Sequence, residues 1–240
     1  MRLLLGLARI VALGGMLALA GCVTAANNSL SQSDIAGMKL TGVAVSFAPD
    51  ARIQWEDGLR AYADSKAVSL EQAATMADVP EVKAFVQGLL TPRIKAGVEQ
   101  VLAARLAGTR PVRLDIRVKS LLFPSAIQRV VIGGHRGMIA DANLVDARTG
   151  ALIVAYPELN AALYTGQGIV GAAVQAAIDN NATQTPVDKV SVRYGEIYRN
   201  WLLKVGGPSA KYAHGTRFAL AIRPLSVLES GPDPGATQGP

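Results

Sequence analysis

Alternating apolar and polar residues predict a series of β-strands. The clearest covers residues 112–119, where even positions are aliphatic and odd positions are charged, as in a strand with one buried and one solvated face. Residues 39–47 alternate in the same way and are expected to form the first strand, which the Ala-Pro-Asp run at 48–50 ends. Residues 138–146 and 151–156 predict the two antiparallel strands of a hairpin, joined by a short loop that ends in glycine.

Apolar residues three or four positions apart predict the longest helix. The stripe runs from Val82 to Leu106, so we expect a helix from Pro80, which suits a first helical turn, to near Gly108. Pro92 falls inside this stretch and is expected to kink or split the helix. The polar side of the helix mixes both signs of charge, which favours packing on a core over lying on a membrane surface.

A second amphipathic helix is predicted near the C-terminal end. Thr185 followed by Pro186 is typical of a helix cap and first helical residue, and the glycine pair at 206–207 is expected to end the helix. Its apolar positions are Val190, Tyr194, Ile197 and Trp201. A small-residue helix is expected over 169–178, and residues 218–222 suit one more edge strand.

Together these elements predict an α/β (α+β) fold. We expect a single mixed or mostly antiparallel sheet, covered on one face by helices, in one domain over residues 39–228. Residues 51–79 are less regular, with short helices expected around Trp55 and from Ser69. Residues 229–240 are rich in glycine and proline, which predicts a disordered tail.

The N-terminus carries the most specific motif of the chain. Two arginines accompany a short apolar beginning, an uncharged run covers residues 10–21, and the only cysteine, Cys22, follows Leu-Ala-Gly. This run is shorter than the about 20 residues that span a bilayer, which favours a signal peptide over residues 1–21 rather than a permanent transmembrane anchor. The Leu-Ala-Gly-Cys sequence resembles the lipobox of bacterial lipoprotein precursors.

This resemblance implies cleavage between Gly21 and Cys22 and lipidation of the cysteine. Three acyl chains, of the palmitate kind, would make membrane attachment effectively permanent. Val23 stands where an aspartate resembles an inner-membrane retention signal, so the resemblance implies the periplasmic face of the outer membrane rather than the inner membrane. Residues 22–38 are small and polar without apolar periodicity, which predicts a flexible tether.

Composition limits the possible partners. The net charge of +6 falls to +4 when Arg2 and Arg9 leave with the signal peptide, no block of like charge is present, and aromatic residues make up only 5% of the chain. These features exclude a typical nucleic-acid reader. We expect the surplus positive charge to form a mildly basic surface that lies close to anionic lipid headgroups. A single cysteine excludes a disulfide framework.

Two surface features are candidates for binding. The charged row Arg113, Asp115, Arg117 and Lys119 suits a solvated sheet face with staggered opposite charges better than a ligand-binding stripe. The run at 133–137 is the candidate ligand or partner loop, because glycines around a histidine indicate a turn with positive φ or a close backbone approach. Its members are Gly133, Gly134, His135, Arg136 and Gly137.

Catalytic and cofactor motifs are weak. Residues 166–171 match G-x-G-x-x-G but lack the parallel βαβ context of a dinucleotide site, so we interpret these glycines as allowing close helix packing. The chain has only two histidines, His135 and His214, and no short paired spacing of zinc ligands. A nucleophile elbow is also missing from the sequence. We therefore predict no catalytic residue, no cofactor and no metal site.

The body of the chain also shows a loose family resemblance. The strand that leads into residues 146–150 and the small-residue helix after Gly168 resemble envelope lipoprotein domains of proteobacteria. More distantly, they resemble the periplasmic α/β domains of the curli secretion lipoprotein and of Tol-system translocation protein B. The resemblance implies fold and location only. Our leading hypothesis is a non-catalytic binding or scaffolding module for other envelope proteins.

Two alternatives remain open. The first is a subunit of a secretion or transport assembly, which would form a homo-oligomer. The second is a hydrolase or small-ligand binder that uses the 133–137 loop.

Overall fold

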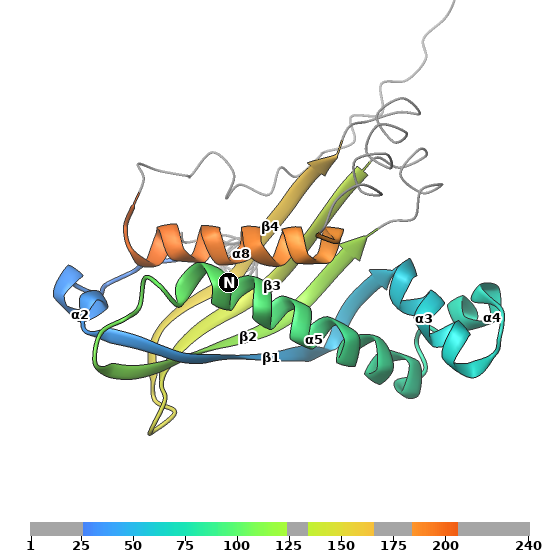
Figure 1. Cartoon of the computed structure of the whole chain (residues 1–240), viewed down its shortest axis with the longest axis horizontal. Helices are drawn as coiled ribbons and strands as arrows, with labels where there is room; N and C mark the ends of the chain where they lie inside the picture. The colour runs from blue at the N-terminus through green and yellow to red at the C-terminus, as the bar shows by residue number, and fades with distance from the viewer. Residues whose placement is uncertain (1–25, 124–133, 166–183, 206–240) are drawn as a thin grey trace, which may run out of the picture. The chain divides into compact units, whose positions relative to one another are not determined.

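The computed structural model describes residues 26–123, 134–165 and 184–205 (Figure 1). The chain divides into two units, residues 1–207 and 208–240, and every described residue belongs to the first. Several predictions therefore lie outside the described residues. They concern the signal peptide, Gly21, Cys22, Gly133, the 166–171 motif, the 169–178 helix, the 218–222 strand and the 229–240 tail.

The described strands form one mixed four-stranded sheet in the order β1-β2-β3-β4. Their bounds are Met38–Trp55 for β1, Arg110–Phe123 for β2, Gly134–Asp146 for β3 and Leu152–Thr165 for β4. β1 and β2 pair in parallel, whereas β2–β3 and β3–β4 are antiparallel. The predicted mixed sheet is confirmed, and β1 and β4 are its edge strands.

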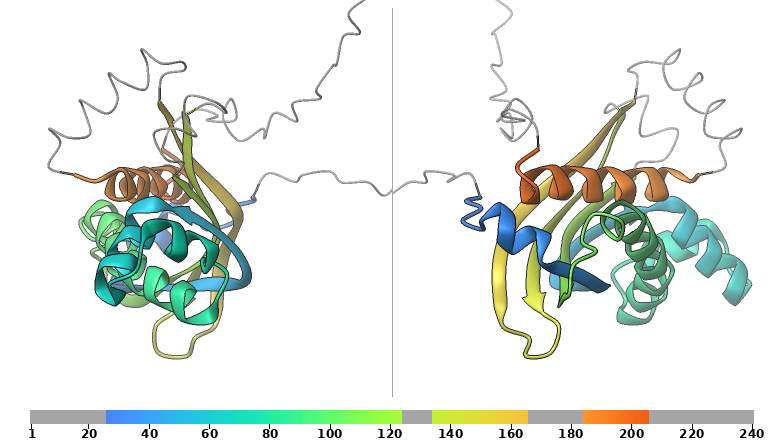
Figure 2. Two further views of the ribbon diagram at one scale, coloured as in Figure 1. Left: turned by 90° about the vertical axis from the view of Figure 1, so that its right-hand side faces the viewer. Right: turned by 60° about the vertical axis from the view of Figure 1, so that its left-hand side comes forward.

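Helices cover one face of this sheet (Figures 1 and 2). The two long ones are α5 (Pro80–Leu102), in the crossover from β1 to β2, and α8 (Pro186–Leu202). The short helices are α2 (Gln32–Ala36), α3 (Glu56–Lys66) and α4 (Leu70–Thr75). The predicted caps are confirmed, because the hydroxyls of Ser69 and Thr185 accept N–H groups of the first turns of α4 and α8.

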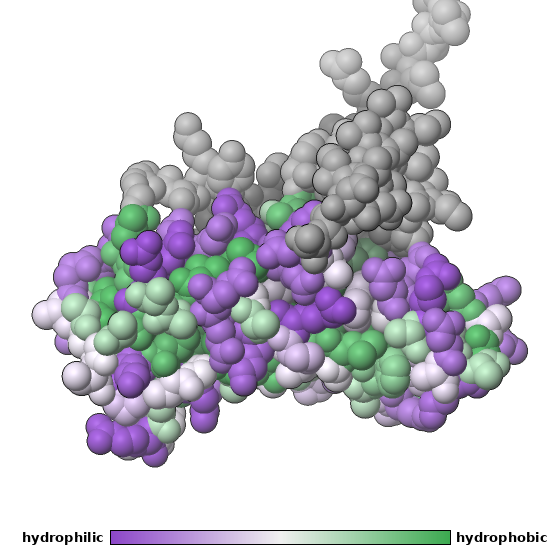
Figure 3. All heavy atoms as spheres, viewed as in Figure 1, coloured by the Kyte–Doolittle hydropathy of each residue, from purple (hydrophilic) through white to green (hydrophobic). Residues whose placement is uncertain are grey.

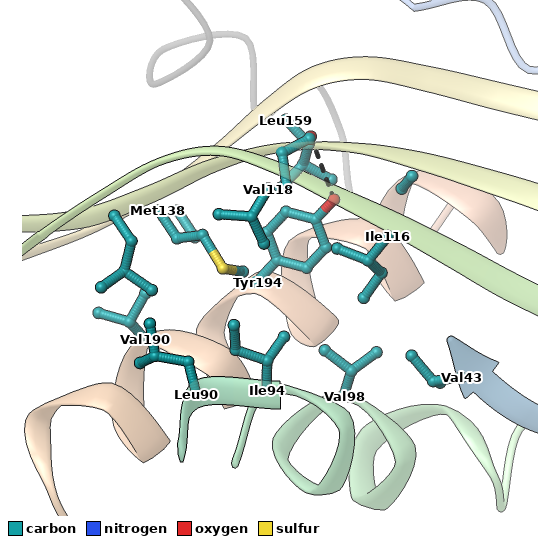
Figure 4. Close-up of a cluster of buried hydrophobic side chains, with 14 of the residues drawn as sticks. Val43, Leu90, Ile94, Val98, Ile116, Val118, Met138, Leu159, Val190 and Tyr194 are labelled. Carbon is teal, nitrogen blue, oxygen red and sulfur yellow. Dashed lines mark hydrogen bonds between the residues drawn. The ribbon is translucent and has the colours of Figure 1, made fainter. Parts of the chain in front are cut away.

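The core lies between the sheet and the two long helices (Figure 4). Inward residues of β2, such as Leu114, Ile116 and Val118, are buried, as the alternation predicted. They meet the apolar stripe of α5, which includes Leu90, Ile94 and Val98. Tyr194 of α8 reaches into the same layer and donates its hydroxyl to the carbonyl of Ala140, with an oxygen–oxygen distance of 3.2 Å. Packing of this layer joins both helices to all four strands of the sheet.

The crossing of α5 and α8 is unusually close. A Cβ added to Gly97 of α5 would lie 2.6 Å from the Cβ of Ser191, and one added to Gly195 of α8 would lie 3.2 Å from the Cβ of Val101. Ser191 is buried, and its hydroxyl donates to the Val187 carbonyl at 2.8 Å. Small residues at these positions therefore set the distance between the two helices.

Pro92 was expected to kink or split the helix, and α5 runs through it without a break, so the split is wrong and the kink stays a prediction. Pro92 and Gly88 lie on the exposed side, where water can satisfy the carbonyl group that the proline leaves free. Hydrophilic and hydrophobic areas are interspersed over the outer surface of α5 and α8 (Figure 3), as expected for core-facing helices. α5 ends at Leu102, earlier than predicted, because the segment that follows turns to pass close to Gly37.

Irregular pairing occurs on three strands, where the sheet continues beyond the predicted ends. The register shifts between Phe47 and Arg52 on β1, between Val118 and Ser120 on β2, and opposite Asp141 on β4. The extra residue on β2 restores the buried face, so that Leu121 is buried although Val118 was the previous inward residue. Each bulge shifts the alternation of side chains by one residue, so the parts of the strand before and after it both turn their apolar residues towards the same core.

Two strand ends were therefore predicted wrongly. The run 48–50 does not end β1, and β4 continues through Pro157, past the predicted strand end at residue 156. Both strands lie at sheet edges, where a residue without an N–H group is tolerated.

The predicted tether over residues 22–38 is also corrected for its described part. Residues 32–36 form α2, and Ser31 and Asp34 cap it reciprocally. Ile35 and Met38 are buried in the core. The stretch from Ala26 onward therefore belongs to the folded body.

Candidate functional site

The face of the sheet opposite the helices is polar, as predicted for the charged row of β2. The guanidinium of Arg113 donates two hydrogen bonds to the carboxylate of Asp115, at 2.6 and 2.9 Å. This bidentate pair raises the pKa of Arg113. Arg117 is exposed beside them. The row is a solvated face with paired opposite charges.

Lys119 joins a small ionic cluster at the bulges. Its ammonium lies 2.9 Å from a carboxylate oxygen of Asp141 and 3.2 Å from one of Glu158. The hydrogen bond to Asp141, with a further contribution from Glu158, raises the pKa of the Lys119 ammonium. Asp141 also accepts the backbone N–H of Glu158, a residue with a positive φ of 52°. The cluster fastens the bulged parts of three strands together.

The candidate loop at 133–137 takes a different form from the predicted turn. Gly134, His135, Arg136 and Gly137 belong to β3 and pair with residues of β4. Of the two explanations offered for its glycines, close approach applies to Gly137, because an added Cβ would lie 3.1 Å from the Ala161 carbonyl oxygen. Arg136 is buried at 5% exposure. A ligand role for this segment remains a prediction.

A groove of about 570 Å³ lies beside the second half of β1. Its apolar lining comes from Trp55, Leu59 and Val86, together with Leu122, whose side chain is exposed. Charged residues of the lining include Asp78 and Lys83, whose side chains form an ion pair at 2.9 Å. A lining that mixes apolar side chains with a few charged ones is the usual composition of a binding site.

Local sequence explains how this groove is built. Trp55 is the last residue of β1 and precedes the first turn of α3. A Cβ added to Gly58 would lie 2.4 Å from the indole ring, so the ring lies directly against the helix backbone. The sequence places Trp55 near a short helix but gives no sign of the groove, because β1, α3, the turn between α4 and α5, α5 and β2 contribute to it from separate segments.

The N-terminal segment is hydrogen-bonded to the end of α8. The indole N–H of Trp201 donates to the Ala26 carbonyl at 2.8 Å, and the Asn28 amide donates to the carbonyls of Trp201 and Leu202 at 3.0 and 2.8 Å. Lys204 donates to the Leu30 carbonyl at 2.6 Å. The two Asn28 bonds satisfy carbonyls that the C-terminus of α8 leaves free, and all four bonds fix the point at which the chain enters the body.

No helix among residues 26–123, 134–165 and 184–205 is long and apolar enough to cross a membrane. In the same residues, histidine, cysteine, aspartate and glutamate side chains nowhere gather in the groups of three that a metal ion would need.

Comparisons with known proteins give loose likenesses. No protein-family model and no curated protein matches the chain. Among solved structures, the chain is similar to one described as a putative lipoprotein from Caulobacter crescentus CB15, with 14% identity, a TM-score of 0.28, and coverage of 47% of this chain and 80% of that chain. It is also similar to a PelC dodecamer from Paraburkholderia phytofirmans, with 11% identity, a TM-score of 0.27, and coverage of 66% and 92%. Similarity at this level assigns no function.

Proposed function

We propose that this chain is a lipid-anchored envelope lipoprotein that acts as a non-catalytic binding or scaffolding module. The lipobox at Cys22 supports export and lipidation, and the cysteine would hold the module at the periplasmic face of the outer membrane. The observation that carries the proposal is the fixed position of Ala26, only four residues after Cys22. A lipid on that cysteine therefore holds the folded body at a defined site rather than on a long free linker.

The groove beside Trp55 supports the binding role. It combines apolar and charged residues at the end of β1 away from Ala26, where a membrane-attached body would remain accessible to another envelope protein. The polar open face of the sheet suits a scaffold that stays in water on that side.

Anchoring is tested by comparing the native chain with Cys22→Ala. Intact mass and membrane fractionation should show acyl chains on the native protein and an unprocessed or released variant. A native protein without acyl mass in the soluble fraction would refute the proposal.

Binding is tested by placing a photoreactive residue at Leu122, which lines the groove, and in a matched chain at Leu152, which is exposed at the start of β4. A specific crosslink to one envelope protein from position 122 alone, lost in Trp55→Ala, supports a binding module. Equal crosslinking from both positions contradicts it.

A further inference from the structure

The spacing between Cys22 and Ala26 limits where the membrane can lie. Four residues span at most about 14 Å when fully extended. Ala26 is bonded to Trp201, and Leu30 is bonded to Lys204, so this distance is measured from the C-terminal end of α8. A lipid on Cys22 would therefore bring that end of the body close to the bilayer surface.

Basic residues gather at this end. We define the anchor-proximal surface as residues 26–39, 103–112, 144–151 and 199–205, which hydrogen bonds join. The N–H of Arg110 donates to the Gly37 carbonyl, and the N–H of Ala147 donates to the Pro111 carbonyl. These segments carry six cationic residues against the two carboxylates of Asp34 and Asp146. The cationic residues are Lys39, Arg105, Arg110, Arg148, Arg199 and Lys204.

Both carboxylates of this surface are engaged locally. Asp34 accepts from the hydroxyl and backbone N–H of Ser31 in the α2 capping box. Asp146 accepts the backbone N–H groups of Arg148 and Thr149 in the β3–β4 turn, and its carboxylate lies 3.6 Å from Arg110. Most of the cationic charge therefore remains available to an external anion.

The other end of the body has the opposite charge. Residues 50–83, which cover the end of β1, all of α3 and α4, and the start of α5, hold seven carboxylates against four cationic side chains. We call this segment the distal end. The 18-residue strand β1 runs from Met38 in the anchor-proximal surface to Trp55 in the distal end, and at ordinary strand rise these two residues lie roughly 50 Å apart. Figure 1 shows α2 and α4 at opposite ends of the described elements.

We propose that the anchor-proximal surface lies against the anionic headgroups of the bilayer that holds Cys22, with β1 leading away from the membrane and the distal end remote from it. The inference rests on the proposed lipid anchor and adds an orientation to it. A negatively charged leaflet attracts basic residues held within a Debye length of its surface and repels the acidic end. Anchor length and charge distribution therefore select the same orientation.

A pair of matched labels tests the orientation. The chain has one cysteine, which lipidation blocks, so a cysteine introduced elsewhere is the only free thiol. Ala36→Cys on α2 and Ala74→Cys on α4 replace exposed alanines of two short helices at opposite ends. Each full-length lipidated variant carries a fluorophore and is reconstituted into phosphatidylethanolamine–phosphatidylglycerol vesicles that contain a headgroup quencher.

The expected result is severalfold stronger quenching at position 36 than at position 74. The ratio should fall when phosphatidylglycerol is left out, because a neutral leaflet no longer attracts the basic anchor-proximal surface or repels the acidic distal end. Equal quenching on anionic vesicles, or a ratio that does not respond to phosphatidylglycerol, would overturn the inference.

Charge reversal provides the matched control. Arg105→Glu with Arg148→Glu removes exposed cations from the anchor-proximal surface and should lower the quenching ratio, as should high salt. Arg52→Glu with Arg60→Glu makes the same charge change at the distal end and should not lower it.

The intact mass of each preparation separates the orientation hypothesis from the lipid-anchor hypothesis on which it rests. Acyl chains on Cys22 together with equal quenching refute the orientation and leave the anchor standing, whereas a chain without acyl mass refutes both.

Discussion

Gly97→Ala offers the sharpest test of how the two long helices determine the core. The added methyl would lie 2.6 Å from the Cβ of Ser191 and 3.1 Å from the backbone nitrogen of Val192. Carbon atoms pack at about 3.5–4.0 Å, so α5 and α8 would have to separate by roughly 1 Å at their crossing. Neither obstacle is a flexible side-chain end. The strain must therefore spread into the packed layer around Tyr194.

The magnitude follows from two opposing effects. Overpacking of a well-packed core costs about 1–3 kcal/mol, and the upper part of that range applies here because backbone atoms block the methyl. Alanine in place of glycine in a helix contributes about 1 kcal/mol in the opposite direction. We expect Gly97→Ala to lower the free energy of unfolding by about 2 kcal/mol. For a domain of this size, this corresponds to a fall in Tm of about 4–8 °C.

Gly88→Ala is the matched control, because Gly88 lies in the same helix and an added Cβ there meets no atom within 4 Å. It should raise the stability by up to about 1 kcal/mol. Urea unfolding, followed by the fluorescence of Trp55 and Trp201, measures both variants. Combining Gly97→Ala with Ser191→Gly should recover part of the loss, since the nearest obstacle is then gone. A Gly97→Ala chain as stable as Gly88→Ala would refute the proposed close crossing.

Four further substitutions test single features. The buried Tyr198 hydroxyl has no hydrogen-bond partner among the residues that the structure describes, so Tyr198→Phe should be neutral or raise the free energy of unfolding by up to about 1 kcal/mol in urea unfolding. Tyr194→Phe should instead lower it by about 1 kcal/mol, because the bond to the Ala140 carbonyl is lost. The backbone N–H groups of Thr149 and Arg148 lower the pKa of the Asp146 carboxyl in the folded state. The ionised carboxylate therefore stabilises the fold fully above about pH 4, and this contribution is lost as the pH falls through the lower pKa of the folded state. Asp146→Asn should make the free energy of unfolding less dependent on pH in this acidic range. Ala67 ends α3 with a φ of 54°, a left-handed conformation that glycine adopts more readily than alanine. Ala67→Gly should therefore raise the free energy of unfolding by up to about 1 kcal/mol, which is measured as a higher Tm.

Each of these predictions has a contradicting outcome. A large loss in Tyr198→Phe would mean that the hydroxyl has a partner. If Asp146→Asn left the fall in stability at acidic pH unchanged, the turn would not favour the carboxylate form of Asp146. A lower Tm for Ala67→Gly would mean that the left-handed cap costs alanine less than the freedom that glycine gains on unfolding.

Elements set by local sequence were predicted well. The alternation of 112–119 and the Thr185–Pro186 cap depend on neighbours within a few positions, and both appear as predicted in β2 and α8. The predicted strand ends at Pro49 and before Pro157 are wrong, because a missing N–H group ends a central strand but not an edge strand, and strand order is not visible in the sequence.

Features built from distant segments could not be predicted. Residues 26–38 look like a linker on their own, since their partners are carbonyls of α8. The groove needs the bulged half of β1, the α4–α5 turn and α5 together. The charge separation between the two ends is hidden by a modest net charge, because the basic residues of the anchor-proximal surface come from four separate segments.

The attachment of the N-terminal segment to α8 also bears on the order of folding. Its hydrogen bonds join residues 171 to 175 positions apart, so they cannot form before nearly all of the described chain is available. Contacts of such high sequence separation close late, after local helices and hairpins. An exported precursor would thus keep the segment around Cys22 free for cleavage and acylation until α8 has crossed the membrane. Completion of the fold would then draw the lipidated end against the body.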